Sequence, residues 1–122
     1  MSQSNMFDFK IITDAVEYLG LQKPFDIRIK SKEHKWAAGF CEQHTRKGKI
    51  IKHVITLYLP SMVSSRFSLE SVILHELIHA WQAENDILVE GEYHGWEFQD
   101  TARELERIFK VPNIFSPESD TE

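Results

Sequence analysis

The chain has 122 residues, of which 42% are hydrophobic and 27% are charged. This size and composition are typical of one compact domain with its own hydrophobic core. The single cysteine, Cys41, excludes a disulfide framework and a four-cysteine zinc ribbon within the chain, so any bound metal must be held by histidines and carboxylates. We expect one domain over residues 1–112 and an acidic, flexible tail over residues 113–122.

The N-terminal stretch "MSQSNMFDFK" has no basic region followed by an apolar run. No window of the sequence approaches the roughly 18 apolar residues that suggest a membrane span. We therefore expect a monomeric cytoplasmic protein, or a nucleoid or nuclear one if it associates with DNA, that is not secreted and has no membrane partner.

The net charge of −5 conceals an uneven distribution. Residues 23–52 carry nine Lys/Arg and three Asp/Glu, a net of +6, whereas the rest of the chain carries five and sixteen, a net of −11. The basic region predicts either a face that binds DNA, with Trp36 and Phe40 available to stack on an unpaired base, or the solvated outer faces of strands.

The first half of the chain predicts a helix followed by three strands. Apolar residues recur at helical spacing up to Leu19, and Gly20 and Pro24 supply stop signals. The strand-like segments are "FDIRIKS", "KWAAGFCEQ" and "KIIKHVITLYL", and Gly48 marks a turn before the last of them. We expect a meander or a curved, mainly antiparallel three-stranded sheet.

The second half predicts two helices. Ser68 is a candidate N-cap with Glu70 in the first turn, and this helix runs to about Asn85. A loop leads to a last helix from about Gly95 to Lys110, which Pro112 stops. The fold class is therefore α+β, with an N-terminal helix, a three-stranded sheet and two C-terminal helices.

The helix over residues 72–83 separates into two faces on a helical wheel. Apolar residues fill one broad arc, whereas His75 and His79 lie one turn apart on the other side, beside Glu76 and Gln82. We expect these two imidazoles to face outward together, because a histidine that serves only as a hydrogen-bonded core residue would fall more naturally within the apolar arc. The alternative is a polar, solvated helix face.

The sequence "HELIH" over residues 75–79 matches the H-E-x-x-H pattern of zinc hydrolases. Histidines four residues apart on a helix reach one ion from the same face, and Glu76 follows the first of them without taking a ligand position. In a zinc site the pKa of a bound water falls to about 7, so a carboxylate can accept its proton. Glu76 is thus a candidate general base.

A catalytic zinc ion needs a third protein ligand, and His94 is the one histidine downstream of His79. It lies where a loop meets the last helix, beside Gly95, and a solvent-exposed helix start is its simpler reading. Glu90, Glu92 and Glu97 are competing ligands, of which Glu97 is favoured because it lies one turn from His94.

These motifs resemble the SprT-like, Spartan-type zinc metalloproteases, which show H-E-x-x-H, about fourteen residues, and then H-G-x-x-F. Here "HELIH" is followed by fourteen residues and "HGWEF". The resemblance implies a minimal zincin-like α+β domain that cleaves polypeptides with one Zn²⁺ ion bound by His75, His79 and His94. It also implies that Glu76 is the catalytic acid/base and that Phe98 supports the loop of the third ligand.

In such zincins an edge strand above the cleft pairs with an extended substrate, and the resemblance assigns this role to "KHVITLYL". Tyr93 is a candidate donor to the oxyanion, with His53 and Tyr58 as weaker ones. We interpret His34, His44 and His53 as strand or surface residues that do not bind metal, and Cys41 as a small buried residue. The competing hypothesis is a latent or non-catalytic zinc-containing module that docks on nucleic acid or a protein through its basic sheet.

Overall fold

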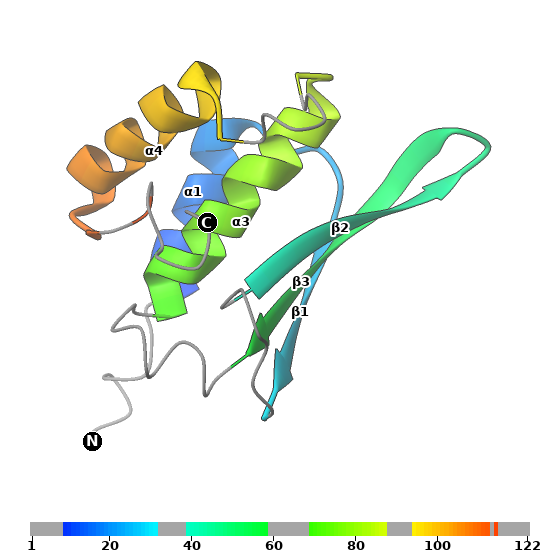
Figure 1. Ribbon diagram of the computed structural model, residues 1–122, viewed down its shortest axis with the longest axis horizontal. Helices are drawn as coiled ribbons and strands as arrows, with labels where there is room; N and C mark the ends of the chain where they lie inside the picture. The colour runs from blue at the N-terminus through cyan, green and yellow to red at the C-terminus, as the bar shows by residue number, and fades with distance from the viewer. Residues whose placement is uncertain (1–8, 32–38, 59–68, 88–93, 113, 115–122) are drawn as a thin grey trace.

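The computed structural model describes residues 9–31, 39–58, 69–87, 94–112 and 114. Its elements follow the order α1 (Phe9–Leu19), β1 (Phe25–Lys30), β2 (Gly39–Arg46), β3 (Lys49–Tyr58), α3 (Leu69–Glu84) and α4 (Trp96–Phe109). The helices gather on one side of the sheet (Figure 1), and α3 contacts α1, α4, β2 and β3. This arrangement confirms the predicted α+β class.

Helix α1 ends at a glycine. Gly20 adopts a positive φ of 71° directly after α1. Its N–H bonds to the carbonyl of Glu17, and the N–H of Leu21 bonds to that of Val16, which together form a Schellman cap. The predicted helix end is therefore correct, and the predicted N-cap of α3, Ser68, lies outside the described residues.

Lys47 and Gly48 form the two-residue turn between β2 and β3. Both have positive φ, at 54° and 77°, as a type I′ hairpin turn requires. The turn at Gly48 is confirmed, and the hairpin that it closes extends away from the helices (Figure 1).

The strand order differs from the expected meander. The order is β1-β3-β2, with β1 parallel and β2 antiparallel to β3, so the sheet is mixed. The strand "KHVITLYL" is therefore central and hydrogen-bonded on both sides, and its predicted role as an edge strand is wrong. The local sequence pattern does not reveal this order, because β1 pairs with β3 and not with β2, the strand that follows it in the chain.

The core lies between the helices and the inner face of the sheet. Its fully buried side chains include Ile12, Ile55, Leu57, Leu74 and Leu105. Within the described ranges, no helix is long and apolar enough to span a bilayer.

Candidate metal centre

Most of α3 is buried, and on the face that carries the histidines His79 remains partly exposed. His75 is 1% exposed, Glu76 5% and Gln82 1%. The expectation that both imidazoles face outward is therefore wrong for His75, and the alternative of a solvated helix face is wrong for His75, Glu76 and Gln82. Helix α4 and residue 114 cover this side of α3, and a helical wheel of α3 alone cannot show that cover.

Three imidazoles converge on one point. His75 and His79 project from adjacent turns of α3, and His94 approaches from the turn before α4. His94 Nε2 lies 3.2 Å from His75 Nε2 and 3.2 Å from His79 Nε2. One ligand nitrogen from each ring lies within 4.8 Å of the other two. The three sequence-predicted histidines therefore form a single cluster.

The outer nitrogens of His75 and His79 contact oxygen atoms. His75 Nδ1 lies 2.7 Å from the backbone oxygen of Ile114, and His79 Nδ1 lies 2.8 Å from Oε1 of Gln82. A carbonyl oxygen only accepts hydrogen bonds, so each Nδ1 carries a hydrogen and donates it. In the neutral rings the lone pair is then on Nε2, directed into the cluster, as in metal-binding histidines with an outer acceptor.

Phe98 packs against the whole cluster. Its ring centroid lies 4.7 Å from those of His75 and His79 and 4.8 Å from that of His94. Phe98 is fully buried near the start of α4, and this apolar surface restricts the rotation of all three rings. The supporting contact that the resemblance implied is thus present, and it reaches all three histidines.

The donor set fits zinc. Zinc binds imidazole nitrogen at about 2.0–2.1 Å, which places two nitrogens of a tetrahedral shell about 3.3 Å apart. The two 3.2 Å separations match this spacing. Glu97 does not join the cluster of potential ligands among the described residues, and Glu90, Glu92 and Tyr93 lie outside them. Three nitrogen ligands are typical of catalytic zinc sites.

Glu76 lies close enough to Cys41 of β2 for its charge to act on the thiol. Burial, and next the negative charge of Glu76, raise the pKa of Cys41. Cys41, which is only partly buried, therefore remains a protonated thiol, in agreement with its interpretation as a residue without nucleophilic activation. In the described part of the sheet β2 is an edge strand, so Glu76 lies near an edge at which an extended chain could pair.

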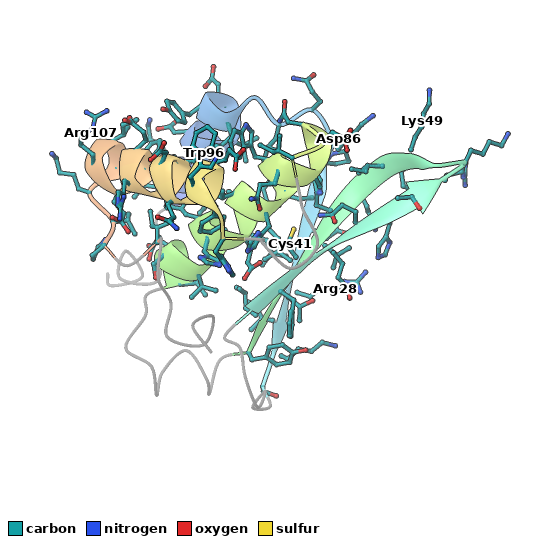
Figure 2. The ribbon with its side chains drawn as sticks, turned by 45° about the horizontal axis from the view of Figure 1, so that its top comes forward. Arg28, Cys41, Lys49, Asp86, Trp96 and Arg107 are labelled. Carbon is teal, nitrogen blue, oxygen red and sulfur yellow. The ribbon has the colours of Figure 1, made fainter. Side chains whose placement is uncertain are left out.

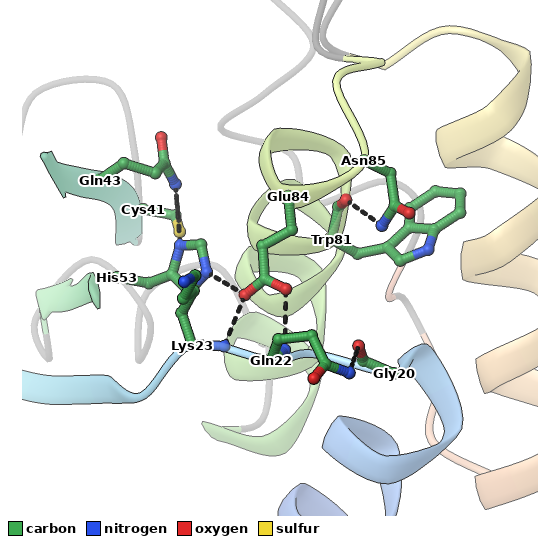
Figure 3. Close-up of polar contacts among 9 residues, drawn as sticks. All are labelled: Gly20, Gln22, Lys23, Cys41, Gln43, His53, Trp81, Glu84 and Asn85. Atoms are coloured by element: carbon green, nitrogen blue, oxygen red, sulfur yellow. Dashed lines mark hydrogen bonds and ion pairs between the residues drawn. The ribbon is translucent and has the colours of Figure 1, made fainter. Parts of the chain in front are cut away.

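His53 belongs to a separate polar network (Figure 3). It is fully buried on β3, and its Nε2 lies 2.7 Å from Glu84 Oε2. Glu84 also accepts hydrogen bonds from the backbone N–H groups of Gln22, at 2.8 Å, and Lys23, at 3.0 Å. This occupied position removes His53 as an oxyanion donor and agrees with its exclusion as a metal ligand.

Tyr58, His44 and His34 also lie apart from the histidine cluster or outside the described residues. Tyr58 packs edge-on against Phe40, with centroids 6.1 Å apart. By strand alternation Tyr58 and buried Leu57 point to opposite faces, so Tyr58 lies on the face away from α3. His44 is exposed on β2, and His34 lies outside the described residues.

Sequence reasoning missed three residues that accept hydrogen bonds from histidines. Gln82 contacts His79, Glu84 contacts His53, and Ile114 contacts His75. A local signal existed for Gln82, because it lies three residues after His79 and hence on the same side of the helix. No local signal existed for Ile114, whose contribution is a backbone oxygen. Ile114 was assigned to the acidic tail, yet it is fully buried.

Comparison with known proteins places the chain in a family. A search of the curated proteins gave no match. A sequence profile of the SprT-like family matches residues 12–117, which include every described helix and strand apart from the first turn of α1, as well as the three histidines. Because this match covers most of the chain, the protein belongs to the SprT-like family.

Proposed function

We propose that this protein is a zinc-dependent endopeptidase that hydrolyses internal peptide bonds of extended, disordered or DNA-linked polypeptides. The observation that carries the proposal is the convergence of the Nε2 atoms of the three histidines. In His75 and His79 the Nδ1–H group is already hydrogen-bonded to an oxygen atom, which leaves Nε2 for the ion. His75, His79 and His94 would hold the ion. Zinc in such a site supplies Lewis-acid chemistry, polarising a carbonyl and making water acidic near neutral pH.

Glu76 is the general base of this proposal. It follows His75 in the chain and is 5% exposed, so its carboxylate stands beside the histidines in a largely water-excluded position. It accepts a proton from the attacking water and then returns a proton to the leaving amine. Its charge raises the pKa of Cys41, which places Glu76 near β2.

The substrate is proposed to extend along β2. Within the described sheet, β2 pairs on one side only, and α3 packs against it. A polypeptide that adds to this edge by main-chain hydrogen bonds would bring a peptide bond past Glu76. Recognition through the backbone suits unfolded substrates of varied sequence.

The decisive experiment measures cleavage of an unfolded protein, such as denatured casein, by the zinc-loaded chain. Glu76→Gln should lower the rate by at least about a hundredfold, because general acid–base catalysis contributes about 10²–10⁴, while bound zinc stays at one equivalent. Glu97→Gln is the matched control and should retain activity. Cleavage that persists in Glu76→Gln, or a zinc-loaded wild type that cleaves no polypeptide, contradicts the proposal and favours a binding module.

We also propose that the β2–β3 hairpin contacts DNA. Arg46, Lys47 and Lys49 are exposed around its turn, away from the helices (Figure 2). Lys47→Glu/Lys49→Glu should weaken single-stranded DNA binding and flatten its salt dependence, because each lost phosphate contact lowers the slope. The control variant Arg107→Glu/Lys110→Glu makes the same change in net charge at the C-terminal end of α4. Equal loss in both variants would show that net charge alone governs binding.

A further inference from the structure

A cavity opens among α1, α3 and α4. It has a volume of about 260 Å³, below the roughly 300–1,000 Å³ of pockets that enclose drug-sized ligands. This size suits one long side chain. Its lining residues are Tyr18 and Leu19 of α1, Trp81 of α3, and Asp100, Thr101 and Glu104 of α4.

The cavity is separate from the histidine cluster. Trp81 lies two residues after His79, and Asp100 lies two residues after Phe98. Two residues correspond to about 200° around a helix axis, so these side chains project away from the cluster on both helices. No histidine lines the cavity.

The lining combines aromatic rings with carboxylates and includes no basic residue. Tyr18 is half exposed at 50%, so its ring is accessible from solvent. Glu104 pairs with Arg107 at 2.5 Å, but the two side chains are 46% and 70% exposed, and such surface pairs are weak and exchangeable. Asp100 forms no ion pair within the described ranges.

We propose that this cavity binds the lysine or arginine side chain of a polypeptide partner. The apolar walls would cover the alkyl stem, the rings would attract the cationic head, and Asp100 and Glu104 would neutralise it. The same carboxylates repel phosphate, which excludes nucleic acid as the occupant. Trp96 of α4 (Figure 2) is 67% exposed and lies one helical turn before Asp100, so it would add an apolar contact for the same partner.

Binding can be tested by NMR titration of the full zinc-loaded chain with the blocked tripeptide acetyl-Gly-Arg-Gly-amide. The matched ligand replaces arginine with citrulline, which has nearly the same shape and no charge. The arginine peptide should shift the Trp81 indole and Thr101 amide signals saturably and bind about tenfold more tightly, from the combined ion-pair and cation–π contributions.

Two variants localise the effect. Asp100→Asn should weaken arginine-peptide binding about two- to fivefold, and Tyr18→Leu should weaken it by a similar factor. Asp86→Asn removes the same charge from an exposed position outside the cavity and should leave binding unchanged. Equal affinity for citrulline, no saturable shift at millimolar peptide, or an equal effect of Asp86→Asn and Asp100→Asn would overturn the proposal. None of these outcomes depends on peptidase activity.

Discussion

His75 donates a hydrogen bond from Nδ1 to the backbone oxygen of Ile114, 2.7 Å away and thirty-nine residues along the chain. The N–H of Ile114 in turn donates to Glu106 Oε2 at 2.9 Å. The segment after α4 is thereby anchored to α4 and also fixes the orientation of the first histidine. We therefore expect metal affinity to depend on the C-terminal segment.

Ending the chain at Pro112 removes the acceptor of His75 Nδ1. Zinc affinity should fall about 10–100-fold, the usual effect of losing an outer-shell partner. Competition with a chromophoric chelator measures the affinity, and circular dichroism establishes that the truncated chain is folded. A truncated, folded chain with wild-type affinity would contradict this coupling.

Ile114→Ala separates the side chain of this residue from its backbone oxygen. The buried side chain contributes to the core, so its truncation should lower the free energy of unfolding by about 2–5 kcal/mol. Zinc affinity of the folded protein should remain close to wild type because the acceptor is retained. Urea unfolding and the same chelator competition give the two values.

The side-chain oxygen of Gln82 should be required for full zinc affinity. Gln82→Leu removes the acceptor of His79 Nδ1 and should weaken zinc binding about 10–100-fold. Gln82→Glu keeps an acceptor at the same position, so it should retain zinc at near wild-type affinity. If both variants bind zinc equally well, the 2.8 Å contact of Gln82 with His79 does not tune the site.

Glu84 should make stability depend on pH in the acid range. Burial raises the pKa of its carboxyl, but hydrogen bonds from the Gln22 backbone, His53 and the Lys23 backbone outweigh burial, so the pKa lies below its ordinary value of 4.5. A carboxyl with a depressed folded pKa stabilises the fold above its unfolded pKa, and this contribution is lost as pH falls through the folded pKa. The loss therefore begins near pH 4.5 and continues below it.

Glu84→Gln tests this contribution. The variant places an amide where a carboxylate accepts backbone N–H groups, and it should lower the free energy of unfolding at pH 7 by about 1–3 kcal/mol. Its difference from wild type should shrink below pH 4.5, as measured by urea unfolding across pH. Asp14→Asn, in an exposed pair with Lys10, should change stability by less than about 0.5 kcal/mol. A constant difference down to pH 3 would contradict the role of the charge.

Gly39 should be required for the close approach of β2 to its neighbours. A Cβ at this position would lie 3.0 Å from the backbone oxygen of Thr56 and 3.1 Å from Val72 Cγ1 of α3. Gly39→Ala should therefore lower the free energy of unfolding by about 1–3 kcal/mol. Glu42→Ala, exposed on the same strand, should have little effect in the same urea titration.

The local elements were predictable because their signals are local. Helical spacing with Gly20 predicted the end of α1, Gly48 predicted the hairpin, and Pro112 predicted the limit of α4, which ends at Phe109. The pairing of β1 with β3 was not predictable in this way. Parallel pairing depends on contacts between segments more than twenty residues apart, which no window of sequence describes.

The sequence by itself determined the chemistry of the candidate site: two histidines one turn apart, a carboxylate between them, and a third histidine at the start of the last helix. These identities follow from helical periodicity and ligand preference. Only the tertiary structure decided that His75 and Glu76 are buried, that β2 rather than β3 is an edge strand, and that Ile114 and Gln82 fix the ring orientations. Those features arise because packing brings distant backbone and side-chain atoms within hydrogen-bonding distance, and burial then excludes the water that would compete with them.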